Sequence, residues 1–103
     1  MKIFNKNYFI SPDQPVLHGH FPGRPILPGV MLLNFVKDTL SQEPGRRCRI
    51  KNIVRHKFIR PVLPEFSVRV ECQLKQTDVE CRIFDQDGNL VASGQYTVEF
   101  LPL

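Results

Sequence analysis

The stretch "GVMLLNFVKDTLSQEPG", residues 29–45, is where the pattern of the chain changes from loop to helix. It predicts a helix over residues 29–41, closed by the turn signal Pro44-Gly45. Asn34, Asp38 and Ser41 form one narrow polar stripe along this helix. Apolar side chains cover the rest of its circumference, so we expect the helix to be buried; they are Val30, Met31, Leu32, Leu33, Phe35, Val36 and Leu40.

The segment before the helix, residues 11–28, is predicted to be an ordered loop. Proline blocks a regular helix or a central strand, because it fixes φ and lacks a backbone donor. It also lowers the conformational entropy of the unfolded chain, so a proline-rich loop can be held in one shape. The prolines of this segment are Pro12, Pro15, Pro22, Pro25 and Pro28.

The remaining segments show the alternation of β-strands. In "FSVRVECQL", residues 66–74, every second side chain is apolar, as in a strand with one buried face. Residues 2–10 fit one short strand or two fragments. The full set of predicted strands is 2–10, 47–60, 66–75, 78–85 and 90–100. We therefore expect one α+β domain over residues 1–103, in which a long antiparallel sheet wraps around one central helix.

Composition limits the function classes. The formal net charge of +4 and the pI of about 9.2 favour an acidic partner. No nucleic-acid motif appears, so a nucleic-acid partner is not expected. Neither a secretory signal nor an apolar run of about 20 residues is present, which predicts a cytoplasmic protein without a membrane span. The three cysteines lack CxxC spacing and indicate neither a disulfide framework nor zinc. We expect no cofactor and no metal.

Basic side chains follow one strand. The segment "RCRIKNIVRHKFI", residues 47–59, would place alternate basic residues on one face. Two interpretations stay open, a solvated strand face and a docking surface for an acidic protein. The residues concerned are Arg46, Arg47, Arg49, Lys51, Arg55 and Lys57.

Three segments together resemble a known family. "GHFPGRPILPGVMLL" (19–33), "KFIRPVLPEF" (57–66) and "LVASGQYTVEF" (90–100) are similar to motifs of the bacterial 3-hydroxyacyl-[acyl-carrier-protein] dehydratases of the hot-dog fold. Glu65-Phe66 stands where Gly-Asp is usual in that family. The long N-terminal segment of typical members has no counterpart. The resemblance implies a hot-dog fold and a dimer.

The resemblance also implies roles for residues. His20 matches the base that removes the proton alpha to the thioester carbonyl, and Gly29 matches the residue whose backbone N–H stabilises the thioester oxygen. Phe21 and Val30, which follow these two residues directly, are expected to bind substrate. His18 lacks a third ligand beside it and His20, so we interpret it as structural rather than metal-binding. An acyl carrier protein is the implied partner.

The helix departs from the family pattern at its acid. Family members carry Glu or Asp fourteen positions after the histidine, which here is Asn34, and usually Gln one turn later, which here is Asp38. An amide has no titratable proton at working pH, so Asn34 cannot itself be a general acid. In the family the histidine and the acid of one site come from different subunits.

Alternatives follow for the function. Asp38 could be a relocated acid in an active dehydratase. A homodimer or a heterodimer with a related hot-dog subunit could bring an acid from the partner to His20. The chain could also be a catalytically silent acyl-carrier or acyl-chain binding subunit. A hot-dog acyl thioesterase is a further candidate, although such enzymes commonly use a helix carboxylate too.

Overall fold

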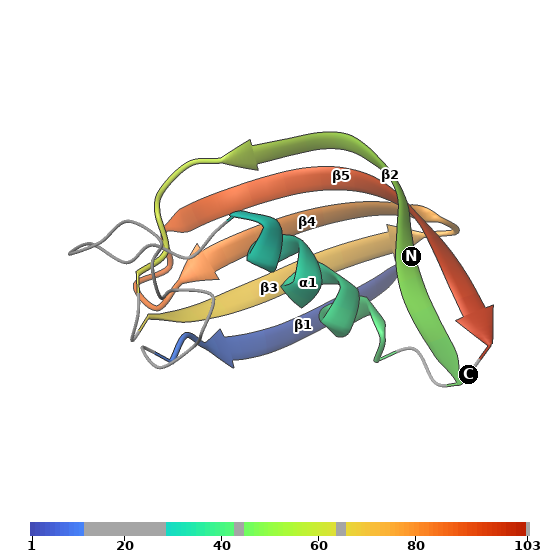
Figure 1. Cartoon of the computed structure of the whole chain (residues 1–103), viewed down its shortest axis with the longest axis horizontal. Helices are drawn as coiled ribbons and strands as arrows, with labels where there is room; N and C mark the ends of the chain where they lie inside the picture. The colour runs from blue at the N-terminus through green and yellow to red at the C-terminus, as the bar shows by residue number, and fades with distance from the viewer. Residues whose placement is uncertain (12–28, 43–44, 64–65, 103) are drawn as a thin grey trace.

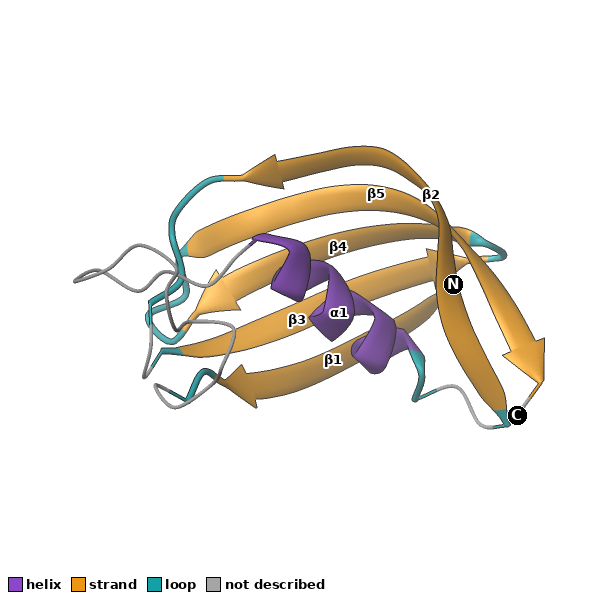
Figure 2. Ribbon diagram, viewed as in Figure 1, coloured by secondary structure: helices purple, strands orange, loops and turns teal. Residues whose placement is uncertain are grey.

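The computed structural model describes residues 1–11, 29–42, 45–63 and 66–102. Five antiparallel strands form one sheet in the order β1-β3-β4-β5-β2, and α1 lies across one face of it (Figures 1 and 2). The elements are β1 (Lys2–Phe9), α1 (Gly29–Leu40), β2 (Arg46–Phe58), β3 (Ser67–Lys75), β4 (Asp78–Asp85) and β5 (Leu90–Pro102). The predicted α+β fold is confirmed.

The element boundaries differ little from the prediction. Residues 2–9 form one strand and not two fragments, and β5 continues two residues beyond the predicted end. Gln76 has a φ of 57° in the turn between β3 and β4, and Gly88 has a φ of 84° in the turn before β5. Both lie in the gaps between predicted strands, at 76–77 and 86–89. In the described part of the chain, no helix is long and apolar enough to cross a membrane.

The core lies between α1 and the sheet. Leu32, Val36 and Leu40 of the helix are buried. They are four residues apart and therefore share one side of the helix. The sheet meets them with alternate buried side chains of its three central strands, which are Val68, Val70, Cys72, Leu74, Val79, Cys81, Ile83, Ala92, Tyr96 and Val98.

The opposite side of α1 is exposed, contrary to the expectation of a helix buried nearly all round. Asn34, Lys37, Asp38 and Ser41 are all exposed. The physical reason is that a single sheet covers only one side of a helix. The polar stripe predicted from the sequence therefore faces away from the core.

β2 is an edge strand and is irregular. Its pairing with β5 shifts between Ile50 and Asn52, and again between Ile53 and Arg55. Lys51 lies in the first of these irregularities and so leaves the basic row predicted from alternation. The rest of that row pairs with alternate residues of β5 and shares one face, namely Arg47, Arg49, Arg55 and Lys57.

The sheet also brings two cysteines together that the sequence spacing did not connect. Cys72 of β3 pairs in register with Cys81 of β4, and their sulfur atoms are 2.8 Å apart. Both are free thiols inside the core. The hydrogen bond with Cys72, together with burial, raises the pKa of the Cys81 thiol.

Candidate functional site

The start of α1 is the first part of the predicted site that the structure describes. Gly29 and Val30 are the first two residues of the helix. The backbone N–H groups of a first helical turn have no partner within the helix and carry its positive dipole end. Gly29 is therefore at the helix end where N–H groups are free to bind an oxygen atom, and its role toward the thioester stays a prediction. His18, His20 and Phe21 lie outside the described residues.

A groove of about 500 Å³ runs between α1 and the middle of β2. Asn34 and Lys37 line it from the helix, and residues 49–53 line it from the strand. The structure thus brings Asn34 together with two of the predicted docking residues, Arg49 and Lys51. The groove is basic, because Lys37, Arg49 and Lys51 line it and no carboxylate occurs among the described residues of its lining.

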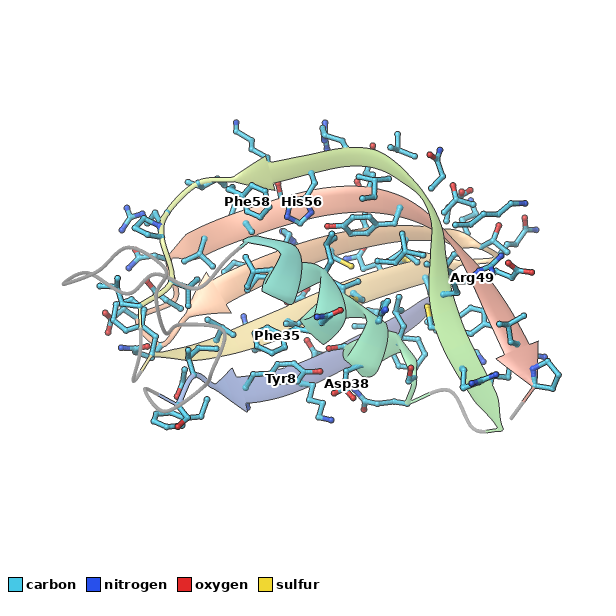
Figure 3. The ribbon with its side chains drawn as sticks, in the orientation of Figure 1. Tyr8, Phe35, Asp38, Arg49, His56 and Phe58 are labelled. Carbon is cyan, nitrogen blue, oxygen red and sulfur yellow. The ribbon has the colours of Figure 1, made fainter. Side chains whose placement is uncertain are left out.

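Asp38 lies in a different environment, against β1. Its Oδ2 atom is 2.7 Å from Nζ of Lys6 and accepts a hydrogen bond of 2.6 Å from the Tyr8 hydroxyl. The Tyr8 oxygen is also 2.9 Å from the Thr39 hydroxyl. The Tyr8 ring stacks on Phe35, with 4.4 Å between ring centroids. Figure 3 shows Tyr8 and Asp38 together on the β1 side of the helix.

These contacts favour the ionised form of Asp38. The hydrogen bond with Lys6, followed by that with Tyr8, lowers the pKa of the Asp38 carboxyl. Burial, followed by the bond to Asp38, raises the pKa of Tyr8. A general acid needs a pKa near the working pH, so both shifts go in the wrong direction for proton donation. Lys6 and Tyr8 were not singled out in the sequence, where they appear only as alternating residues of a strand.

The predicted docking residues are exposed at the beginning of β2. Arg46, Arg47, Arg49 and Lys51 all face solvent. Arg49 is already paired with Glu99 of β5, at 2.6 Å. Arg47 and Lys51 are therefore the better candidates for contacting an external acidic group.

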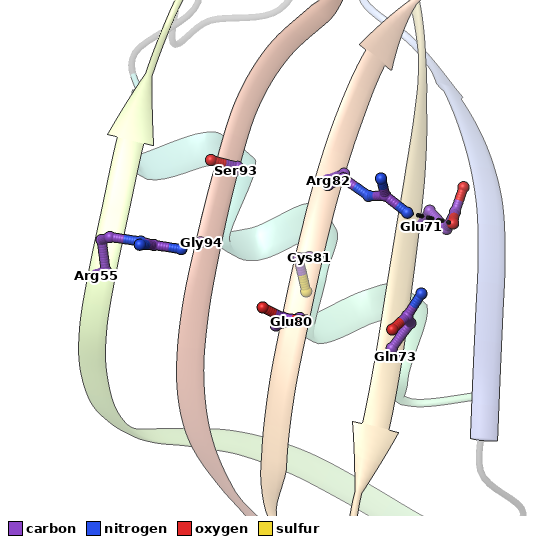
Figure 4. A pocket seen from close by; sticks show the side chains of 8 residues that line it. All are labelled: Arg55, Glu71, Gln73, Glu80, Cys81, Arg82, Ser93 and Gly94. Carbon is purple, nitrogen blue, oxygen red and sulfur yellow. Dashed lines mark hydrogen bonds and ion pairs between the residues drawn. The ribbon is translucent and has the colours of Figure 1, made fainter. Parts of the chain in front are cut away.

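A second hollow, of about 280 Å³, lies on the face of the sheet away from α1 (Figure 4). Its lining is mixed in charge, and Arg82 lies 3.3 Å from Glu71 there. Among the described residues that line it, Arg55 belongs to the predicted basic row, and none is a predicted catalytic or substrate-binding residue. The groove beside α1 is consequently the better candidate for the functional site.

His56 and Tyr96 form a pair that the sequence analysis did not single out. Nδ1 of His56 is hydrogen-bonded to the Tyr96 hydroxyl, and the His56 ring lies 4.2 Å from the Phe58 ring. Burial lowers the pKa of His56 and raises that of Tyr96. Periodicity could not reveal this pair, because alternation shows which face of the sheet a residue is on and not which residue of another strand lies beside it.

Metal binding finds no support in the described ranges. Within residues 1–11, 29–42, 45–63 and 66–102, no group of three or more His, Cys, Asp or Glu side chains is arranged to hold an ion.

Sequence comparison places the chain beside dehydratases. The family model described as ApeI dehydratase, ApeI-like, matches residues 3–95. The 3-hydroxyacyl-[acyl-carrier-protein] dehydratase FabZ of Klebsiella pneumoniae is 34% identical over 77 residues, which is 66% of this chain and 51% of that protein. FabZ of Salmonella arizonae has the same values. The chain thus spans about half the length of the curated relatives it matches.

Structural comparison agrees at the level of the fold. The dehydratase heterocomplex ApeI:P from Xenorhabdus doucetiae matches with a TM-score of 0.80 and 21% identity, covering 93% of this chain and 86% of that one. An uncharacterised protein from Erwinia carotovora matches with a TM-score of 0.75 and 24% identity, covering 98% of this chain and 84% of that one. The (R)-hydratase from A. caviae matches with a TM-score of 0.66 and 21% identity, covering 95% of this chain and 93% of that one. These structures share the hot-dog fold.

The Asp38 cluster predicts a measurable pKa change. Replacing Lys6 with Met, or Tyr8 with Phe, removes a hydrogen bond to the carboxylate, so the pKa of Asp38 should rise toward its ordinary value of 3.8. NMR titration of the Asp38 carboxyl carbon measures it. Lys75→Met, on an exposed lysine of β3, is the control and should leave the Asp38 titration unchanged.

The lowered pKa of Asp38 also determines how the free energy of unfolding depends on pH. Because the folded pKa is depressed, the stabilisation by Asp38 is present above pH 3.8 and is lost as the pH falls through the folded value. The Lys6 and Asp38 side chains are 45% and 52% exposed, so Asp38→Asn should lower the free energy of unfolding at pH 7 by at most about 1 kcal/mol. An undiminished difference at low pH would contradict the ion pair.

Proposed function

Since the chain belongs to the ApeI-like dehydratase family, we propose that it is a subunit of a dehydratase that acts on 3-hydroxyacyl thioesters bound to an acyl carrier protein, in fatty-acid or polyketide synthesis. In this proposal His20 is the general base. Gly29 provides the N–H that stabilises the thioester oxygen, and Phe21 and Val30 contact the acyl group. The proposal rests on the family match and on the groove beside α1.

The chemistry divides the work between a base and an acid. Removal of the proton alpha to the carbonyl puts negative charge on the thioester oxygen, which the N–H groups at the start of α1 can stabilise. The 3-hydroxyl group then leaves as water and requires a proton. Asn34 can orient this hydroxyl by hydrogen bonding but has no proton to give.

The placement of Asn34 carries the proposal that the acid comes from a second subunit. Asn34 is exposed on the groove beside β2, so the histidine of another chain can reach this position. By the same arrangement, the acid that acts with His20 would come from the helix of that other chain. The carboxylate one turn later, Asp38, is held ionised against β1. A homodimer would place Asn34 at the acid position of both sites. A heterodimer with an acid-bearing relative would instead complete one site, so it is the assembly we favour.

β2 is the surface on which that subunit would pair. Strand pairing at an edge joins two chains through backbone hydrogen bonds. The second half of β2 and the residue after it expose large apolar side chains that a partner subunit would cover. They are Ile53, Val54, Phe58 and Ile59. The docking candidates Arg47 and Lys51 lie in the first half, although the exposed Arg55 and Lys57 lie in the second. Carrier docking would therefore use the beginning of the strand and subunit pairing its end.

A silent binding subunit is the second candidate, and Asn34 favours it. Without a helix acid, the chain could hold an acyl group or a carrier protein and leave turnover to another protein. Both candidates use the same groove. They differ in whether the reaction depends on His20.

Dehydration assays distinguish these candidates. The protein alone, and with an acid-bearing hot-dog partner, is incubated with 3-hydroxyacyl carrier protein, and the enoyl product is measured. We expect turnover with the partner, a loss of about 10²–10⁴-fold in His20→Ala, and little change in Asp38→Asn. Asn34→Glu should give the chain activity by itself. If neither assembly turns over while carrier binding persists, the silent subunit is the correct interpretation.

The pairing edge is tested by one charge. Val54→Lys places an ammonium group in the proposed interface, so the subunit affinity should fall by at least about tenfold, measured by light scattering over a dilution series. Ile3→Lys on β1 is the matched control, because Ile3 and Val54 are 57% and 60% exposed. A larger loss in Ile3→Lys would assign the interface to β1 instead.

Carrier docking is tested by charge reversal. The double change Arg47→Glu and Lys51→Glu should weaken binding of acyl carrier protein by about tenfold at low salt, as exposed ion pairs are lost. The control is Arg60→Glu with Lys75→Glu, which makes the same change in net charge on exposed residues elsewhere. Calorimetric titration measures both. Equal weakening in the two variants would mean that only net charge matters.

A further inference from the structure

His56 lies on the same side of the sheet as α1. It pairs in register with Gly94 of β5, whose neighbours on that face, Ala92 and Tyr96, belong to the core beneath the helix. α1 begins over the β5 and β2 side of the sheet and ends over β1 (Figures 1 and 4). Figure 3 shows the His56 ring at the end of the sheet where α1 starts. His56 is therefore on the side that holds the proposed thioester site.

The glycine opposite His56 makes room for its partner. A Cβ atom added to Gly94 would overlap the hydroxyl and ring of Tyr96. The Tyr96 hydroxyl can therefore lie over Gly94 and reach Nδ1 of His56. On its other side the imidazole is packed by the Phe58 ring. Contacts on both sides fix the orientation of the ring.

The hydrogen-bond count assigns the tautomer. Nε2 of His56 is buried and has no hydrogen-bond partner among the described residues. If the Tyr96 O–H donates to Nδ1, both of these groups are satisfied, and the remaining ring proton is on Nε2. If instead Nδ1–H donates to Tyr96, the tyrosine proton needs another acceptor as well. Burial lowers the pKa of His56 and so favours the neutral ring in either case.

We propose that His56 presents its Nε2–H as a fixed hydrogen-bond donor to an oxygen atom of the bound acyl thioester, and that Tyr96 is the positioning residue that holds the ring in this tautomer. A buried donor without an acceptor is destabilising, so a ligand oxygen that satisfies it gains affinity and orientation. This inference rests on the proposed function, since it assigns a second contact for the same substrate class.

NMR of the imidazole nitrogens provides the test. The chain has three histidines, and the signal missing in His56→Phe identifies that of His56. The probe is a 3-hydroxyacyl-pantetheine in which an amide replaces the thioester. It keeps the carbonyl oxygen and the 3-hydroxyl oxygen but does not react. The free protein should show a neutral ring with its proton on Nε2. Adding the probe should shift the Nε2 and H signals along the binding curve.

The variants separate the donor from its packing. His56→Phe keeps an aromatic ring and should weaken probe binding by about tenfold, as expected for one hydrogen bond. Tyr96→Phe should lose the single tautomer in the spectrum of the free protein. Phe58→Leu changes the packing against the same ring and should leave the Nε2 response intact. Urea unfolding of each variant shows that it is folded.

The outcomes separate this inference from the proposed function. If the probe binds but the His56 signals do not move, or if His56→Phe binds as tightly as the unmodified protein, the donor role is wrong and the proposed function stands. A free protein with the proton on Nδ1 also overturns the donor role. If neither the probe nor the thioester binds the unmodified protein or its complex with a partner, both proposals fail.

Discussion

The contact between one side of α1 and the sheet is the constraint on which the other features depend. Leu32, Val36 and Leu40 are buried there. Full burial of such a side chain contributes about 1.5–3 kcal/mol, so turning the helix about its axis would cost several kcal/mol. The rotation of the helix is therefore fixed. Once it is fixed, the direction of every polar residue on α1 follows.

This rotation separates two residues that look equivalent in the sequence. Asn34 and Asp38 are four residues apart, which means about 6 Å along the helix axis and about 40° around it. Because α1 crosses the sheet obliquely, the earlier residue lies beside β2 and the later one beside β1. Lys6 and Tyr8 then pair with Asp38 and hold it ionised. The groove therefore contains the amide of Asn34 and not the carboxylate of Asp38. Because an amide cannot be a general acid, the proposed mechanism takes the acid from a second subunit.

The edge strand β2 connects the proposed roles. Its two irregularities against β5 place Lys51 out of the basic row. They also leave His56 on the side of the sheet that faces α1, bonded to Tyr96. Its exposed apolar side chains lie in its second half, and the docking candidates Arg47 and Lys51 lie in its first half. Subunit pairing, carrier docking and substrate contact can therefore be altered separately by substitution.

The sequence by itself determined the elements, the fold class and the family, because these depend on local signals. The Pro28-Gly29 start of the helix, the alternation in residues 66–74 and the motif around His20 are all readable over a few positions. It also identified the amide at Asn34 through a count along the chain. The exposure of the outer side of α1 was not predicted, because an apolar pattern does not say how many faces a neighbouring sheet can cover.

Only the tertiary structure decided which side chains meet. Asp38 joins Lys6 and Tyr8 across about thirty residues of chain, His56 joins Tyr96 across forty, and Cys72 joins Cys81 through strand pairing. These contacts depend on the rotation of the helix and on the register of β2, including its two irregularities. Neither quantity is a property of a short stretch of residues. Both are set by the packing of the whole domain.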